Sequence, residues 1–169
     1  MNLVIIDYKL SNLYSVEHAC QKLGYNPVVS SDAKDIDDAD AIILPGVGAF
    51  SEAMHNLNKL DLKEPIIENV NAGKPFMGVC LGMQLLFSKS EEEGLSNGLN
   101  LISGTVNKMR IDKNLKIPHV GWNNLINKKK HPLLENIKDE IDFYFVHSYT
   151  CLPDKTDDIK AEFFYGKNY

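Results

Sequence analysis

The first half of the chain consists of short apolar runs separated by longer stretches whose apolar residues recur every three or four positions. The short runs lie at residues 3–6, 26–30, 41–44 and 76–79. Short runs rich in β-branched residues are typical of strands that are buried on both faces of a parallel sheet. We therefore predict four parallel strands at these positions.

Helical spacing fills the stretches between these strands. Leu13, Val16 and Cys20 fall on one face of a predicted helix that ends near Gly24, which is a natural C-terminal cap. Further helices are predicted around residues 53–60 and 66–73. The acidic connection at residues 32–40 carries five aspartates, but their alternation with apolar residues favours a solvated short helix over a cation site.

This order of strands and helices predicts the fold class. Alternating strands and helices indicate an α/β protein with a doubly wound, mostly parallel sheet of the flavodoxin-like kind. In such sheets ligands gather at the carboxyl ends of the strands. The turns that follow Ile6, Leu44 and Val79 should therefore share one edge, which would bring the loop of residues 46–48 close to Cys80.

The second half of the chain has a different character. A polar stretch at residues 88–100 is followed by short predicted strands at residues 101–106, 116–119, 124–126, 142–148 and 160–164. No long helical pattern separates them, so we predict an antiparallel β extension of the sheet or a flanking β layer. A length of 169 residues suits one domain, and we expect residues 1–169 to form a single domain.

Composition narrows the classes of function. The hydrophobic content of 44% and charged content of 24% are ordinary for a globular protein, and a net charge of −5 argues against nucleic acid as a partner. Three scattered cysteines predict neither a disulfide framework nor a metal cluster. No signal peptide or membrane-spanning run is apparent, so we expect a cytoplasmic protein that binds no membrane. We also expect no metal and no cofactor.

One corner carries the strongest chemical signal. The sequence KPFMGVCLGMQLLF (residues 74–87) places Cys80 after an apolar run, with Gly78 and Gly82 on either side and a helical pattern beyond. A strand, a sharp turn and a helix would expose the thiol as a nucleophile, and small flanking residues would let the turn pack tightly. The alternative interpretation is a buried structural cysteine, but the paired glycines favour an exposed, reactive Cys80.

Acyl transfer at a cysteine also needs donors for the oxyanion and a general base. The donors are available in the backbone N–H groups of Leu81 and of the loop formed by Gly46, Val47 and Gly48. The candidate bases are the histidines, which are His18, His55, His119, His131 and His147. Position alone favours His147 because it ends a predicted strand.

Four motifs together carry a resemblance to a known family. They are GVCLGMQ (residues 78–84), PGVGAF (residues 45–50), PHVGWN (residues 118–123) and FYFVHSY (residues 143–149). The first resembles the nucleophile motif of class I, or triad-type, glutamine amidotransferases. The set, in this order over essentially the whole chain, resembles the glutaminase subunit of imidazole glycerol phosphate synthase.

The resemblance implies a reaction and a partner. Cys80 would attack the side-chain amide of glutamine, with Gly46, Val47, Gly48 and Leu81 around the oxyanion. The residues implied to hold the amino-acid part of glutamine are Gln84, Glu92, Ser148 and Tyr149. The released ammonia would pass to a separate cyclase subunit of the (β/α)₈-barrel type in histidine biosynthesis. Trp122 and Asn123 would lie near that partner.

Two departures from the family pattern matter. In the family the base and its orienting acid come from a His-Pro-Glu element, and the resemblance argues against His147 in that role. The printed sequence holds no such element, so we expect that a C-terminal segment is missing and that the 169-residue chain alone is inactive. The second departure is DYKLSN (residues 7–12), where the family usually has small residues at Lys9 and Leu10.

Several alternatives stay open at this point. A paralogous subunit that supplies ammonia for amidino groups on bacterial surface sugars would share the same motifs. A cysteine hydrolase on a similar fold would share the Cys80 corner but not the residues around Gln84 and Tyr149. A flavodoxin-like binding module would carry Cys80 as a structural or redox-active residue, although the sequence holds no phosphate-binding loop of the flavin type.

Overall fold

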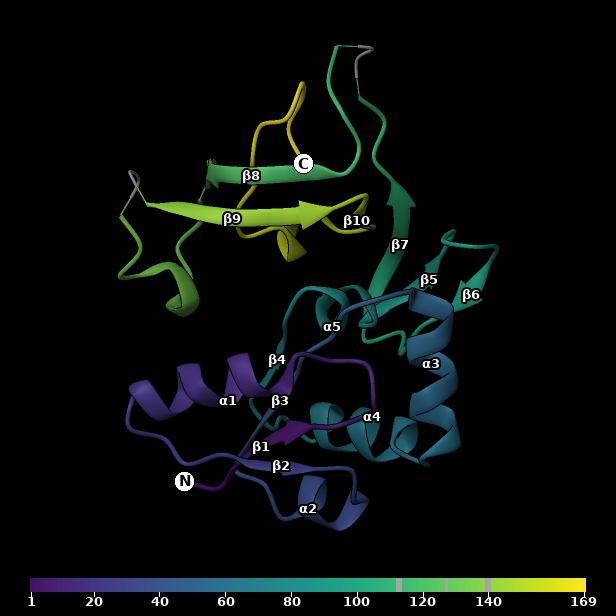
Figure 1. The fold of residues 1–169 in the computed structure, drawn as a ribbon, viewed down its shortest axis with the longest axis vertical. Helices are drawn as coiled ribbons and strands as arrows, with labels where there is room; N and C mark the ends of the chain where they lie inside the picture. Colours follow the sequence, from purple (N-terminus) through teal and green to yellow (C-terminus); the bar gives the residue numbers. More distant parts are fainter. Residues whose placement is uncertain (112–113, 127, 139–140) are drawn as a thin grey trace.

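The computed structural model describes residues 1–111, 114–126, 128–138 and 141–169. Figure 1 shows a lower part built on the first four strands and an upper part built on the later ones. The helices are α1 (Leu13–Lys22), α2 (Ala33–Asp37), α3 (Phe50–Lys59), α4 (Lys63–Asn71) and α5 (Leu81–Gln84), with short 3₁₀ turns η1 (Pro132–Leu134) and η2 (Thr156–Asp158).

The first sheet confirms the predicted fold class. Its strands are β1 (Leu3–Ile6), β2 (Val28–Ser30), β3 (Ala41–Leu44) and β4 (Phe76–Gly78), all parallel in the order β2-β1-β3-β4. The sequences of these strands do not alternate between apolar and polar residues because helices cover both faces of the sheet. Leu3 and Ile5 pack with Cys20 of α1, whereas Val4 and Ile6 pack with residues of α2, α3 and α4 in the larger core.

The later strands form two further sheets. One holds β5 (Phe87–Ser90), β6 (Ser96–Asn97), β7 (Ile102–Lys108) and β10 (Tyr149–Pro153) in the order β10-β7-β5-β6, and the other pairs β8 (His119–Asn124) with β9 (Asp142–His147). Most of these pairs are antiparallel, and β5 runs parallel to β7. The predicted β extension in the second half is therefore confirmed.

Several predicted elements in this half were wrong in their limits. The strand expected at residues 116–119 begins only at its last residue, and the one expected at 124–126 keeps only the end of β8 and an isolated bridge. The strand expected at 160–164 is reduced to isolated bridges, and β5, β6 and β10 were not predicted. The helix expected after Cys80 stops at Gln84. Tertiary contacts override its helical spacing, because the carbonyl oxygens of Leu85 and Leu86 accept hydrogen bonds from residues 99, 101 and 102 instead of continuing a helix.

The described residues show neither a membrane-spanning helix nor a group of side chains that could bind a metal ion. No described helix is long and apolar enough to cross a membrane. Among the same residues, no group of three or more His, Cys, Asp or Glu side chains is arranged to hold a metal ion.

Candidate active site at the carboxyl edge of the parallel sheet

Cys80 occupies a strained turn between β4 and α5. Its backbone has φ 56° and ψ −118°, a region that residues with a Cβ rarely adopt, and its side chain is exposed. The Cys80 carbonyl accepts hydrogen bonds from the N–H groups of Met83 and Gln84. These hydrogen bonds form the first turn of α5. A strained, exposed residue held by its neighbours is typical of a nucleophile presented on a sharp corner.

The glycines on either side of Cys80 are required by close packing. A Cβ added to Gly82 would lie 1.8 Å from the Leu44 carbonyl oxygen, and one added to Gly78 would lie 2.7 Å from the Met83 Cα. These obstacles are backbone atoms, which cannot move aside without shifting a strand or helix. The prediction that small residues let this corner pack tightly is thus supported by the distances.

The loop of residues 46–48 lies against the same corner. A Cβ on Gly46 would lie 3.0 Å from both the Gly82 nitrogen and the Leu81 Cβ, so the predicted proximity of this loop to the corner is confirmed. Gly48 has φ 99°, a left-handed conformation that favours glycine. The structure therefore brings this loop, through Gly46, against Leu81.

The donors differ in their availability. Within the described chain, no hydrogen bond is found from the N–H groups of Leu81 or Gly48. The Val47 N–H donates to the Leu10 carbonyl at 3.0 Å, so it is engaged away from Cys80. Leu10 stands where the sequence departs from the family pattern. Its role as the partner of Val47 depends on the fold and has no signal in the sequence.

Two of the predicted substrate-binding residues lie beside the loop. Glu92 Oε2 accepts a hydrogen bond from the Phe50 N–H at 2.9 Å, which places this carboxylate at the start of α3, directly after the loop. Tyr149 begins β10, and burial, then the charges of Glu92 and Glu93, raise the pKa of its hydroxyl.

The other two predicted residues have backbone roles. Gln84 ends α5, and its N–H donates to the Cys80 carbonyl at 3.3 Å, whereas its half-buried side chain makes no hydrogen bond to the described residues. Ser148 lies between β9 and β10, and its carbonyl accepts from the Met109 N–H at 2.9 Å. Gln84 thus lies on the helix that follows Cys80, one turn away from it.

The histidines do not supply Cys80 with a base. His119 Nδ1 and His147 Nε2 are 3.2 Å apart, and His147 Nδ1 lies 2.8 Å from the Tyr149 carbonyl oxygen. Since Nδ1 of His147 donates to that carbonyl, its Nε2 accepts from His119. Burial, then the nearby His147, lower the pKa of His119. None of the five histidines hydrogen-bonds the Cys80 thiol in the described chain, and the sequence did not predict this histidine pair.

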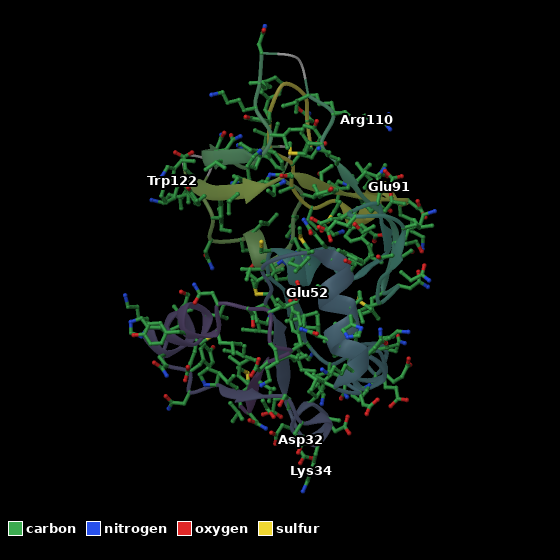
Figure 2. All side chains as sticks on the ribbon, turned by 45° about the vertical axis from the view of Figure 1, so that its right-hand side comes forward. Asp32, Lys34, Glu52, Glu91, Arg110 and Trp122 are labelled. Atoms are coloured by element: carbon green, nitrogen blue, oxygen red, sulfur yellow. The ribbon has the colours of Figure 1, made fainter. Side chains whose placement is uncertain are left out.

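Trp122 and Asn123 lie on opposite faces of β8. The Trp122 side chain is 70% exposed and lies at the periphery of the molecule (Figure 2), whereas the Asn123 amide donates to the Phe164 carbonyl at 2.8 Å. Cross-strand pairing aligns Trp122 with Tyr144 and Val120 with Val146, and all four side chains are more than half exposed. This exposed apolar face, made of Val120, Trp122, Tyr144 and Val146, was only partly predicted.

Comparison with known families identifies the class of protein. The family model described as "Glutamine amidotransferase class-I" matches residues 4–167, which is nearly the whole chain. The chain belongs to this family. The resemblance predicted from the four motifs is therefore confirmed, and so is the assignment to glutamine amidotransferase enzymes.

Individual members of the family agree with this assignment. "Imidazole glycerol phosphate synthase subunit HisH" of Geobacillus sp. (strain WCH70) is 47% identical over 166 residues, covering 96% of this chain and 78% of that protein. The protein of the same name from Caldanaerobacter subterraneus subsp. tengcongensis is 51% identical over 145 residues, covering 86% and 70%. The solved structure of PurLQS from Thermotoga maritima has a TM-score of 0.70 at 19% identity, covering 99% of this chain and 76% of that one, and supports the fold alone.

The sequence of this amidotransferase did not predict two residues that contact the loop of residues 46–48. One is Leu10, which holds the Val47 N–H. The other is Tyr8, which is fully buried and whose hydroxyl has no hydrogen-bond partner among the described residues. Tyr8 directly follows the buried strand β1, where an apolar side chain is usual. A tyrosine at this edge of the sheet was the feature of the sequence that could have indicated a role for it.

Proposed function

We propose that this chain is the glutaminase subunit of an imidazole glycerol phosphate synthase and supplies ammonia to a cyclase subunit in histidine biosynthesis. The observation that carries the proposal is the strained, exposed Cys80, followed by the Leu81 N–H that has no partner among the described residues, in a chain 47% identical to a subunit of that name. The alternatives of a general cysteine hydrolase and of a binding module are disfavoured by the family assignment.

The chemistry proceeds in two steps at Cys80. The sulfur attacks the side-chain amide carbon of glutamine, so that a C–S bond forms and the C–N bond breaks. The departing nitrogen takes a proton and leaves as ammonia, and a γ-glutamyl thioester remains. Water then adds to the thioester carbon, the C–S bond breaks, and glutamate leaves with the thiol restored.

The oxyanion formed in each step needs donors fixed in advance. The N–H groups of Leu81 and Gly48 suit this role because Leu81 follows Cys80 directly, Gly48 belongs to the loop that packs against Leu81 through Gly46, and neither N–H has a partner in the described chain. The Val47 N–H can join them once it leaves the Leu10 carbonyl. We therefore propose Gly46, Val47, Gly48 and Leu81 as the oxyanion hole.

The amino-acid end of glutamine requires a negative group for its ammonium and donors for its carboxylate. Glu92 suits the ammonium because one carboxylate oxygen is held by the Phe50 N–H at the start of α3, leaving the other oxygen for the ligand. Tyr149 and Ser148 lie on the neighbouring strand junction, and Gln84 lies on α5. We propose that these four residues orient the substrate above Cys80.

The exposed apolar face of β8 and β9 is the proposed docking surface for the cyclase. Val120, Trp122, Tyr144 and Val146 form two cross-strand pairs, and the rings of Trp122 and Tyr144 meet edge to face at 5.4 Å. Clustered exposed aromatic residues are typical of the centre of a protein interface. We propose a heterodimer with a (β/α)₈-barrel cyclase, into which the ammonia is channelled.

Labelling with an electrophilic glutamine analogue tests the glutaminase proposal. We expect one label per chain, at Cys80, with glutamine protecting the thiol and Cys80→Ser abolishing the label. Because no histidine hydrogen-bonds Cys80 among the described residues, we also expect the 169-residue chain to be labelled without sustained release of glutamate. Labelling of Cys80 that glutamine does not block would refute glutamine as the substrate. Robust turnover by this chain would refute the reasoning about the base.

Complementation tests the pathway. The full-length gene that contains this coding sequence should restore growth without histidine to a strain that lacks the glutaminase subunit of imidazole glycerol phosphate synthase. Labelling that glutamine blocks, together with failed complementation, would instead point to the paralogous role in amidino-sugar synthesis.

Binding to the cyclase subunit tests the docking surface. Trp122→Ala should weaken binding at least tenfold, since truncating an aromatic residue at the centre of an interface typically costs about 2 kcal/mol or more. Phe164→Ala is the matched control, because Phe164 is also an exposed aromatic residue, at 57%, but does not belong to the β8–β9 face. Equal effects of the two substitutions would contradict the assigned surface.

A further inference from the structure

Tyr8 holds an unpartnered hydroxyl inside the protein at the active edge. The residue follows β1, its side chain is 0% exposed, and no described residue accepts or donates a hydrogen bond at its hydroxyl. Buried hydroxyls normally have a partner, because losing water without replacement is costly. An unsatisfied hydroxyl in an active site therefore points to a partner that arises only in some states.

The hydroxyl points at the corner that carries the nucleophile. A Cβ on Gly46 would lie 2.1 Å from the Tyr8 oxygen and 3.0 Å from the Gly82 nitrogen and the Leu81 Cβ. The hydroxyl therefore lies within about 5 Å of both of these atoms, as the triangle formed with that point requires. Leu81 follows Cys80 directly, so the hydroxyl lies between the loop of residues 46–48 and the corner that carries Cys80.

The neighbouring groups leave a negative charge at Cys80 as the natural partner. Asp7 and Lys9 on the same turn pair with each other at 2.6 Å, and Glu92 is held by the Phe50 N–H. Strands β3 and β4, helix α5 and the loop of residues 45–49 carry no charged side chain, and Cys80 is the titratable residue between β4 and α5. Burial, and then the charge of Cys80, raise the pKa of the Tyr8 hydroxyl, so it stays protonated and able to donate.

We propose that the Tyr8 hydroxyl donates a hydrogen bond to the sulfur of Cys80 when that thiol ionises. The thiol proton leaves to solvent or to a base, the sulfur gains the negative charge, and the Tyr8 proton turns toward it without being transferred. Tyr8 would then be a further catalytic residue that favours the thiolate, the form that attacks the glutamine amide. The proposal deepens the proposed glutaminase function, but its test does not require glutamine turnover.

The test is the pH dependence of iodoacetamide alkylation at Cys80, followed by mass spectrometry of the peptide that contains it. We expect Tyr8→Phe to move the midpoint of the pH–rate profile upward by about one unit, because a hydrogen bond to a charged group is lost. A thiolate with a higher midpoint is also more nucleophilic, with a Brønsted slope near 0.4–0.5, so the rate at pH 7 should fall about three- to fourfold rather than tenfold.

Two controls separate this role from packing. Ser11→Ala removes another buried, unpartnered hydroxyl from the same turn, and Tyr14→Phe removes a hydroxyl from a tyrosine that is 73% exposed. Neither should move the midpoint. Tyr8→Phe should leave the urea midpoint of unfolding unchanged or higher, since its hydroxyl has no partner in the resting protein. An unmoved alkylation midpoint, an equal shift in Ser11→Ala, or a loss of stability in Tyr8→Phe would each overturn the proposal.

These outcomes are independent of the proposed function. A shifted midpoint together with labelling that glutamine does not block would keep the role of Tyr8 and reject glutamine as the substrate. An unmoved midpoint together with labelling that glutamine blocks would do the reverse.

Discussion

Replacing Cys80 with glycine should stabilise the protein relative to replacing it with alanine. The backbone of Cys80 has φ 56° and ψ −118°, and holding a residue with a Cβ there costs about 1–3 kcal/mol. Glycine avoids that strain but loses about 0.5–1 kcal/mol more in conformational entropy. The side chain is exposed, so neither substitution removes buried apolar contact. We therefore expect the free energy of unfolding of Cys80→Gly to exceed that of Cys80→Ala by roughly 1–2 kcal/mol.

The stabilities of Cys80→Gly and Cys80→Ala can be compared by urea unfolding monitored by far-ultraviolet circular dichroism. For a chain of this size the expected difference corresponds to about 2–8 °C in melting temperature. Ala19→Gly is the control, because Ala19 is exposed within α1 and has ordinary helical geometry, so glycine there should destabilise by about 0.5–1 kcal/mol. The sign of the glycine effect should thus reverse between the two sites. A Cys80→Gly protein no more stable than Cys80→Ala would show that Cys80 does not hold a strained conformation.

Three further predictions concern the site and its surroundings. Gly82→Ala would place a Cβ 1.8 Å from a backbone oxygen of β3, so urea unfolding should show a loss of about 3 kcal/mol or more; a loss below 1 kcal/mol would refute the close packing. Burial and His147 lower the pKa of His119, so the unfolded chain binds its proton more tightly and stability should fall as pH drops through about 6.5. His119→Phe should flatten that fall between pH 7 and 5, and an unchanged slope would contradict it. Glu92→Gln keeps an acceptor for the Phe50 N–H, so melting should be unaffected while glutamine no longer protects the thiol; retained protection would remove Glu92 from the substrate site.

The sequence was sufficient for those elements whose pattern is local. The unbroken apolar runs at β1 and β3 predicted a sheet covered on both faces, and each face is indeed packed against helices. The paired glycines around Cys80 predicted a tight corner, because only glycine fits where the backbones of β3 and α5 approach each other. In both cases the physical demand acts on residues that lie next to one another in the chain.

The remaining parts depend on contacts between distant residues. Helical spacing continues to Phe87, yet α5 ends at Gln84 because the following residues pair with Leu99 and Leu101 across the chain. The direction of the Tyr8 hydroxyl and the hydrogen bond from Val47 to Leu10 are set by three-dimensional packing. No periodicity along the sequence encodes them.

Cys80 and the loop of residues 46–48 are held by interactions of different strength. Cys80 is fixed by backbone approaches that leave no room for a single methyl group at Gly78 or Gly82, so its position cannot change without moving a strand. The Val47 N–H is held by one hydrogen bond to Leu10, and such a bond contributes only about 0.5–1.5 kcal/mol. A partner or substrate that favours the released form by that amount is sufficient to redirect this donor. Control of the reaction should therefore act on the loop, with Cys80 already in place.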